Sequence, residues 1–244
     1  MTAKNLQPQY RLLTEFEGLF RGKTYRHRSS THGDFVAMHL YEDLLSIRRS
    51  GKYLRGVTES RERVVNAENK RHGVSARRGD GTLGQIIPGE SPVFYRGYGV
   101  GRGRVATLEI GVEVKILAKA MIKQIDRVTN DLKKQVEQFR RGGGDPICVG
   151  IVGINQAEKY VSYEGDKLWP TTGRNGYLHP SQEAGKAEER LERDARPDFD
   201  EFLLIRFRAT NEAPFPFEWV DLRGLRLDYG AVLARISEKY EKRF

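Results

Sequence analysis

Apolar residues along this 244-residue chain recur in patterns that predict strands alternating with helices. Residues 105–117, 147–154 and 201–209 are runs rich in Val, Ile, Leu and Phe without proline, which is typical of buried strands. Segments of helical periodicity flank these runs, at 34–50, 118–140, 181–195 and 229–243. This order of elements predicts an α/β fold in which a mixed central β-sheet is flanked by α-helices.

The segment 118–140 has the most regular helical pattern. Its apolar positions, spaced by three and four residues, are Met121, Ile125, Val128, Leu132, Val136 and Phe139, and they predict a face packed on the sheet. The opposite face carries Lys119, Lys123, Arg127, Asn130 and Lys134. Lys119, Lys123 and Arg127 are candidates for contacts with a phosphate backbone. An ordinary solvated face is the alternative, above all at Lys134.

The remaining segments are less regular. Residues 52–70 are basic and predict a strand followed by irregular chain, and the glycine-rich 97–103 predicts a flexible approach to a substrate. Residues 165–180 are too long for a simple connection, and their aromatic residues argue against disorder, so they are expected to contact nucleic acid or a partner subunit. The length fits one domain, with a core at about 34–161 and a C-terminal extension, 162–244, packed on it.

The charge balance indicates a polyanionic partner. The chain has 42 Lys and Arg against 33 Asp and Glu, a formal net charge of +9. Residues 48–78 hold ten basic and three acidic residues, whereas 183–201 hold eight acidic and four basic ones. A concentration of positive charge in one segment is typical of phosphate binders. Contact with RNA or a membrane surface, or a basic surface without a partner, would also fit the composition.

Other features narrow the class of protein. No apolar run approaches the length of a membrane span, and the first residues lack the apolar core of a signal peptide. The single cysteine, Cys148, lies in an apolar run and is expected to be a buried thiol, which fits a reducing cytoplasm. The histidines show no metal-ligand spacing with Cys or acidic residues, so no zinc site is predicted; they are His27, His32, His39, His72 and His179.

The candidate chemistry lies in the strand predicted at 105–117. Side chains alternate along a strand, so Glu113 and Lys115 share one face while Val114 points to the other. Charges are rarely buried without a partner or a metal ion. Asp80 stands upstream, where a turn opens into a short predicted strand. Two carboxylates suit a hard divalent cation such as Mg²⁺, and a lysine beside it can assist a water nucleophile. A structural Glu–Lys pair at a sheet edge is the alternative.

An Asp, a gap of about thirty residues, Glu-x-Lys on a strand and then a long helix together resemble the PD-(D/E)XK nuclease superfamily. The matching residues are Asp80, Glu113 and Lys115, with Gly79 where the motif name has proline. The resemblance covers residues 34–161 and implies a restriction-endonuclease-like fold. In that superfamily an acidic residue of the first helix sometimes joins the metal site, which makes Glu42 a candidate accessory acid.

The resemblance further implies a DNA endonuclease that hydrolyses phosphodiester bonds with Mg²⁺, or with Mn²⁺ as a substitute. Asp80, Glu113 and the backbone carbonyl of Val114 would hold the metal ion, and Lys115 would assist the water. Proteins of this size in the superfamily include type II restriction enzymes and phage-defence effectors. A homodimer that cuts double-stranded DNA is expected, because one site per subunit cuts one strand. The alternative function is a nucleic-acid-binding module with a vestigial nuclease site.

Overall fold

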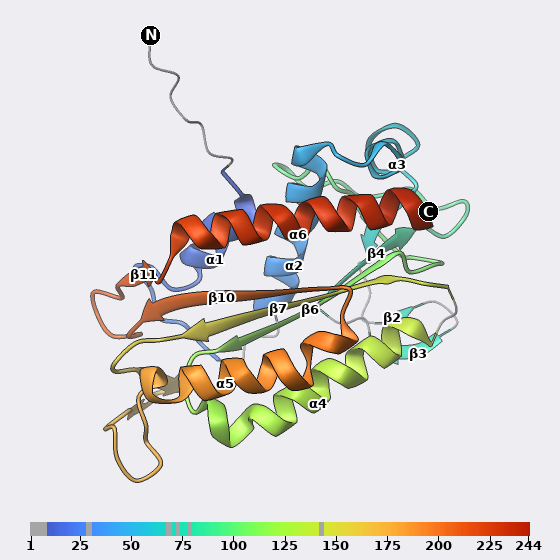
Figure 1. The fold of residues 1–244 in the computed structure, drawn as a ribbon. Helices are drawn as coiled ribbons and strands as arrows, with labels where there is room; N and C mark the ends of the chain where they lie inside the picture. The colour runs from blue at the N-terminus through green and yellow to red at the C-terminus, as the bar shows by residue number, and fades with distance from the viewer. Residues whose placement is uncertain (1–8, 28–30, 67–69, 72–73, 78–79, 142–143) are drawn as a thin grey trace.

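The computed structural model describes residues 9–27, 31–66, 70–71, 74–77, 80–141 and 144–244 (Figure 1). Its centre is a seven-stranded sheet. In spatial order the strands are β11 (Phe217–Trp219), β10 (Glu201–Ala209), β7 (Ile147–Asn155), β6 (Ile110–Leu117), β4 (Gly81–Gln85), β1 (Arg63–Asn66) and β5 (Arg102–Gly103). Strands β6, β7 and β10 are parallel, whereas β4 and β11 run antiparallel to β6 and β10. The structure confirms the predicted α/β class with a mixed central sheet.

Helices cover both faces of this sheet (Figure 1). One face carries α1 (Arg11–Gly18), α2 (Thr31–Ile47) and α6 (Leu222–Arg243), and the other carries α4 (Met121–Arg140) and α5 (Pro180–Asp194). Shorter elements are α3 (Gly51–Leu54), the π-helical turn η1 (Arg55–Glu59) and the 3₁₀ turn η2 (Arg196–Asp198). Two hairpins lie outside the sheet, β2 (Lys70–Arg71) with β3 (Val74–Arg77), and β8 (Val161–Glu164) with β9 (Lys167–Pro170). Each face of the sheet therefore has its own apolar core.

The central strands are apolar because helices cover them on both sides. Every residue of β7 is buried, and its pairing with β6 runs without interruption from Ile110↔Ile147 to Leu117↔Ile154. On β6, a Cβ at Gly111 would lie 2.6 Å from the Phe139 ring of α4, so glycine allows the helix to approach the strand. Since side chains alternate, the odd-numbered positions of β6, which include Glu113 and Lys115, face α4.

The predicted packing of the long helix is confirmed. All six residues of its apolar stripe are buried on the sheet face that α4 and α5 cover. Cys148, at the start of β7, is a buried free thiol, as expected, and burial raises its pKa to about 11. That thiol is therefore neutral and unreactive at physiological pH.

Several boundaries differ from those predicted. Helix α4 begins at Met121, because Ala120 adopts a left-handed conformation with φ of 49° after the strand, and Lys119 lies in this turn. Helix α6 begins at Leu222, where Asp221 caps it by accepting a hydrogen bond from the Gly224 backbone N–H at 2.9 Å. The prediction placed these starts at 118 and 229. Both differences reflect local capping and backbone geometry rather than hydrophobic pattern.

Two irregular predictions are wrong in detail. Residues 52–70 begin with helix, since α3 and η1 precede β1. Residues 165–180 are not one long loop, because 167–170 form β9 and pair with β8. The glycine-rich connection 97–103 is held by hydrogen bonds from its backbone to the Glu42 carboxylate. The basic stretch 48–78 lies partly outside the described residues.

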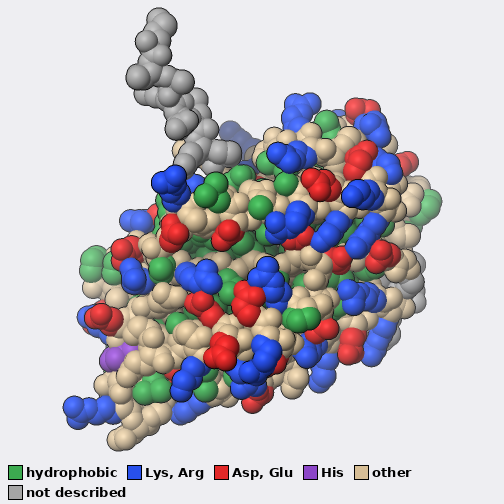
Figure 2. Space-filling model, viewed as in Figure 1, with side chains coloured by type: hydrophobic (Ala, Val, Ile, Leu, Met, Phe, Trp, Pro, Cys, Tyr) green, Lys and Arg blue, Asp and Glu red, His purple; other side chains and the backbone are tan. Residues whose placement is uncertain are grey.

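The C-terminal segment 162–244 is integral to the same sheet. It supplies β10, which pairs in parallel with β7 from Glu201↔Val149 to Phe207↔Asn155, and it supplies one helix to each face. On the face shown in Figure 2, Lys and Arg side chains are scattered among Asp and Glu. Within the described ranges no helix has both the length and the apolar character needed to cross a bilayer.

Candidate functional site

The strands β4 and β6 separate at the point where the candidate residues begin. They pair only from Gly81↔Val112 to Leu83↔Ile110, and β6 continues to Leu117. Asp80 precedes β4, and its Oδ2 accepts a hydrogen bond of 2.7 Å from the Val114 backbone N–H. The N–H and C=O of a strand residue point to the same side, so the Val114 carbonyl faces the Asp80 side of β6. The carboxylate therefore takes the place of a pairing strand.

The three predicted catalytic residues are brought together here. Extending the β4–β6 register by one residue sets Asp80 opposite Glu113. Glu113 is 6% exposed, and its carboxylate forms an ion pair with the Lys115 Nζ. An acid directly before β4 thus meets an acid and a lysine of β6.

The electrostatics of this group are unusual for a structural ion pair. Burial, and then the neighbouring Asp80 carboxylate, raise the pKa of Glu113 to about 7, although Lys115 opposes the shift. Burial disfavours the charged Lys115, but the Glu113 and Asp80 carboxylates outweigh it and raise the pKa of that lysine. The two acids repel each other, and a bound cation would relieve that repulsion.

A cavity of about 610 Å³ opens beside these residues. Seven parts of the chain meet there: the segment before α2, the first turn of α2, Asp80, the end of β6, the turn that follows it, one face of α4 and the end of β8. Its walls are Tyr25, His27, His32, Gly33, Asp80, Val114, Lys115, Ile116, Leu117, Ala118, Lys119, Gln124, Arg127, Val128, Asp131 and Glu164. The volume is in the range of small-molecule sites, and the lining includes charged residues of both signs.

The predicted phosphate-binding residues divide between two places. Lys119 and Arg127 line the cavity; the Lys119 ammonium donates to the Ser162 hydroxyl, and Arg127 Nη2 donates to Gln124 Oε1 at 2.9 Å. Burial lowers the pKa of Lys119, although Glu164 opposes the shift. Lys123 lies outside the cavity and lines an adjacent hollow. Two of the three predicted cations therefore face the site directly.

Glu42 is engaged elsewhere. This buried residue of α2 accepts hydrogen bonds from the backbone N–H groups of Gly99, at 3.0 Å, and Val100, at 2.8 Å, and it pairs with Arg11 at 3.2 Å. It does not line the cavity. These contacts hold the connection 97–103 in place, so flexibility there is not what the structure shows. A role for Glu42 as an accessory acid stays a prediction.

Gly33, in the first turn of α2, has a steric role in the site. A Cβ at this position would clash with the Asp80 carboxylate. The absence of a side chain lets the first turn of the helix approach that carboxylate, and the positive end of a helix favours a nearby negative charge. Asp80 is thus held between the first turn of α2 and the Val114 amide.

Sequence reasoning missed the aromatic and histidine wall. The His27 ring lies 3.1 Å from the Tyr160 hydroxyl, and the His32 ring stacks on Tyr25 with centroids 4.8 Å apart. Burial, and then Lys119, lower the pKa of His27 to about 4, so this ring is neutral at pH 7. No spacing in the sequence indicates that these residues belong to the site, because the fold brings them there from far away along the chain.

Asp131 was also missed, although a signal for it exists. It follows Arg127 by four residues and Gln124 by seven, so the three share one face of α4. All three line the cavity, and the Asp131 charge contributes to the raised pKa of Glu113. The prediction for the polar face of this helix named its basic residues and Asn130 and omitted Asp131.

The donor set fits a hard divalent cation. Among the described residues, no three or more Asp, Glu, His or Cys side chains are grouped to hold a metal ion. Mg²⁺ is usually held by only one or two carboxylates and keeps several waters. The Asp80 and Glu113 carboxylates with the Val114 carbonyl meet that requirement, whereas zinc sites take three or four Cys, His or acidic ligands.

Comparisons of this chain with protein-family models, with curated proteins and with solved structures give no match.

Proposed function

We propose that this protein is a Mg²⁺-dependent DNA endonuclease of the PD-(D/E)XK kind, acting in restriction or phage defence. The observation that carries the proposal is the meeting of Asp80, Glu113 and Lys115 beside a cavity whose lining includes Asp80, Lys115, Lys119 and Arg127. The order Asp80, β4, β6, α4 and β7 agrees with the arrangement that the sequence resemblance implies. The raised pKa of Glu113 is typical of residues held for chemistry rather than for stability.

Each residue has a role that follows from its position. Asp80 and Glu113, with the Val114 carbonyl, would hold Mg²⁺, which supplies Lewis acidity at the scissile phosphate and lowers the pKa of a bound water. Lys115 holds a positive charge beside this group and stabilises the negative charge that develops as water attacks. Lys119 and Arg127, on the cavity wall, position the neighbouring phosphates of the backbone.

The partner and assembly follow from the same site. The net charge of +9 and the Lys119 and Arg127 side chains that line the cavity favour a nucleic acid, and duplex DNA is the proposed substrate. One site per chain cuts one strand, so cleavage of both strands calls for two copies, and a homodimer in the cytoplasm is the proposed working form.

The test is nicking of supercoiled plasmid DNA by the purified protein. Conversion to open-circular and linear DNA is expected with Mg²⁺ or Mn²⁺ and none in excess chelator, because the carboxylates act through the metal ion. Cleavage that continues undiminished in chelator would refute the metal-dependent mechanism. DNA binding without cleavage under any divalent cation would favour a binding module with a vestigial site.

A further inference from the structure

A second hollow, of about 200 Å³, adjoins the cavity. It lies between β9, the following loop and the start of α4, and its walls include Lys123, Trp169 and Tyr177. Lys119 and Glu164 line both this hollow and the cavity. A ligand can therefore extend from one to the other without leaving the protein surface.

Exposed aromatic side chains mark this place. Trp169 is 43% exposed and Tyr177 55%, and the neighbouring Leu168 is 57% exposed. The β8–β9 hairpin that carries Trp169 and Leu168 lies outside the main sheet, and all four residues of β9 are exposed. Clustered exposed apolar surface on a small projecting hairpin is typical of a binding site.

The loop that carries Tyr177 is closed by its own hydrogen bonds. The backbone N–H groups of Thr172 and Gly173 each donate to the Tyr177 carbonyl at 2.9 Å, and the Tyr177 N–H donates to the Arg174 carbonyl at 2.8 Å. At its base, the Thr171 hydroxyl accepts a hydrogen bond from the Tyr160 N–H at 2.9 Å. The loop that carries Tyr177 is therefore ordered before a ligand binds, which lowers the entropic cost of binding.

Positive charge surrounds these rings. The Lys119 ammonium donates to the Ser162 hydroxyl, and Ser162 pairs directly with Trp169 across the hairpin. The Lys123 ammonium approaches the other wall, since a Cβ at Gly176 would lie 2.6 Å from its Nζ. The walls of this hollow and of the next one along the hairpin carry Arg26, Lys119, Lys123 and Lys167 and, as the one acidic residue, Glu164.

We propose that this hollow binds an unpaired nucleotide of the DNA substrate, with its base against Trp169 and Tyr177 and its phosphates at Lys119 and Lys123. A base inside a duplex has both faces covered by its neighbours, whereas an unpaired base offers a face to an aromatic ring. Aromatic rings set among cations are the combination that binds single strands without reading sequence. The inference rests on the proposed nuclease function and names a preferred form of its duplex substrate: duplex DNA with an unpaired nucleotide beside the scissile bond.

The test is binding, measured in chelator so that no DNA is cut. The probes are a fluorescein-labelled DNA hairpin with a blunt end and the same hairpin with about six unpaired thymidines at its 5′ or its 3′ end. The wild-type protein is expected to bind one of the extended hairpins at least about tenfold more tightly than the blunt one. Trp169→Ala should weaken that binding by roughly fivefold to a hundredfold and leave blunt-end binding unchanged.

Matched variants make the result specific. Trp169→Phe keeps a ring and should retain most of the preference, and Leu168→Ala, on the other face of β9, should retain all of it. The chain has two tryptophans. In a Trp219→Phe background the fluorescence of Trp169 should therefore be quenched by the extended hairpin and not by the blunt one.

Each outcome decides the matter. No preference for an extended end, or equal losses on blunt and extended hairpins in Trp169→Ala, would overturn the proposal and leave duplex DNA or a protein as the occupant of this surface. Binding and cleavage are separate measurements. If the protein prefers extended hairpins through Trp169 but never cuts DNA, the hollow binds unpaired nucleotides and the nuclease proposal is refuted. If the protein cuts DNA but shows no such preference, the nuclease proposal stands and the proposal for the hollow is refuted.

Discussion

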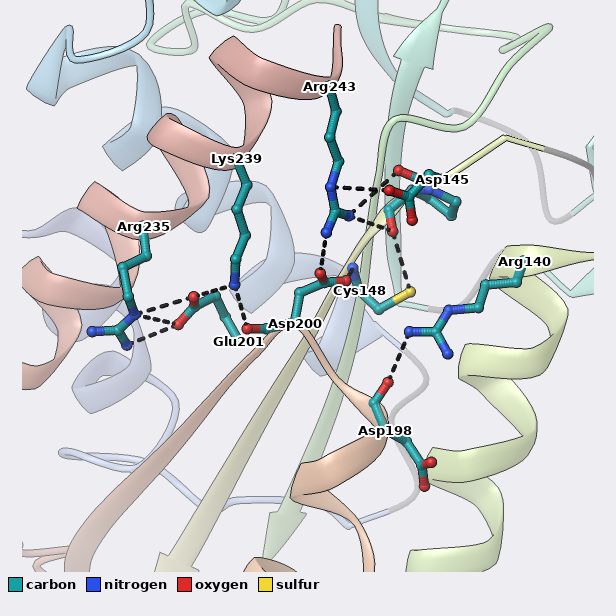
Figure 3. A network of polar contacts seen from close by, with 10 residues as sticks. Arg140, Asp145, Cys148, Asp198, Asp200, Glu201, Arg235, Lys239 and Arg243 are labelled. Atoms are coloured by element: carbon teal, nitrogen blue, oxygen red, sulfur yellow. Dashed lines mark hydrogen bonds and ion pairs between the residues drawn. The ribbon is translucent and has the colours of Figure 1, made fainter.

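The two ends of the parallel strands gather acidic and basic side chains in different ways. At the amino end of β7 and β10, Glu201 lies between Arg235, at 2.8 Å, and Lys239, at 2.6 Å, and Asp200 pairs with Arg243 (Figure 3). We call this group the ionic cluster. Arginine and lysine side chains from the C-terminal half of α6 pair with both acids of this cluster. At the other end, beside β6, the Asp80 and Glu113 carboxylates lie close together, and Asp80 lines the cavity.

The pKa values of the acids show what this difference means. Burial acts against ionisation of Asp200, but Arg243 and the Cys148 N–H outweigh it and lower the pKa of that carboxyl. In the cavity, burial and Asp80 prevail over Lys115 and raise the pKa of Glu113 to about 7. At neutral pH the ionic cluster stabilises the fold, whereas the cavity costs stability. A costly arrangement that persists beside a hollow is typical of a functional site.

The largest expected effect is the loss of DNA cleavage when the acids beside the cavity are changed, in contrast to changes in the ionic cluster. Asp80→Asn should abolish DNA cleavage while the protein still binds DNA, because this carboxylate serves the metal ion rather than docking. Lys115→Ala should lose at least about a hundredfold, the scale of a positioned electrostatic group. Initial rates on plasmid DNA in Mg²⁺ measure both.

Glu201→Gln is the matched control in the ionic cluster. It should leave the cleavage rate unchanged and lower the free energy of unfolding by about 2 kcal/mol, since charged hydrogen bonds to Arg235 and Lys239 are weakened. Asp80→Asn should not lower that free energy. If Glu201→Gln abolished cleavage and Asp80→Asn only destabilised the fold, the roles assigned to the two ends would be reversed.

The second prediction uses pH. The folded-state pKa of Glu113, about 7, lies above its ordinary value of 4.5, so its contribution to stability is complete below pH 4.5 and is lost as pH rises to about 7. In metal-free protein, Glu113→Gln should therefore gain stability relative to wild type over this range, by roughly 3 kcal/mol. Denaturant unfolding at a series of pH values measures the difference. A constant difference would show that Glu113 is ionised in the folded protein throughout.

The smallest expected effect concerns the basic residues beside the cavity. Lys119→Ala and Lys123→Ala should each weaken duplex binding severalfold, equally across DNA sequences, and reduce the slope of log affinity against log salt by about one unit. Lys134→Ala is the control, because this exposed residue of α4 lines neither the cavity nor the adjacent hollow. Identical slopes in all three variants would place the phosphate contacts elsewhere.

The buried strands and the buried face of α4 were the elements that the sequence predicted most accurately. The strands at 147–154 and 201–209 and the apolar stripe of α4 agree with the structure within a residue, because covered positions must be apolar at a fixed period. It failed where capping or local geometry decides, as at η1 and at the starts of α4 and α6. The β8–β9 hairpin also escaped prediction, because its strands are short and its second strand is exposed on both faces.

The residues of the site also fall into those that the sequence predicts and those that it does not. Asp80, Glu113 and Lys115 could be predicted because strand alternation and one antiparallel pairing bring them together. The wall formed by Tyr25, His27 and His32 could not, since no spacing connects it to the motif. The contacts of Glu42 could not be predicted either, since its carboxylate accepts hydrogen bonds from the backbone of Gly99 and Val100, more than fifty residues along the chain.

The most direct test of this account is titration of Mn²⁺ into the metal-free protein, followed by calorimetry without DNA. The account predicts a single Mn²⁺ per chain in the wild type and in Glu201→Gln, and no binding in Asp80→Asn or Glu113→Gln. The wild type should also unfold at a higher temperature when Mn²⁺ is present, because the ion binds only the folded state. Absence of binding in the wild type, or equal binding in all four proteins, would contradict the claim that the cavity acids hold a metal ion.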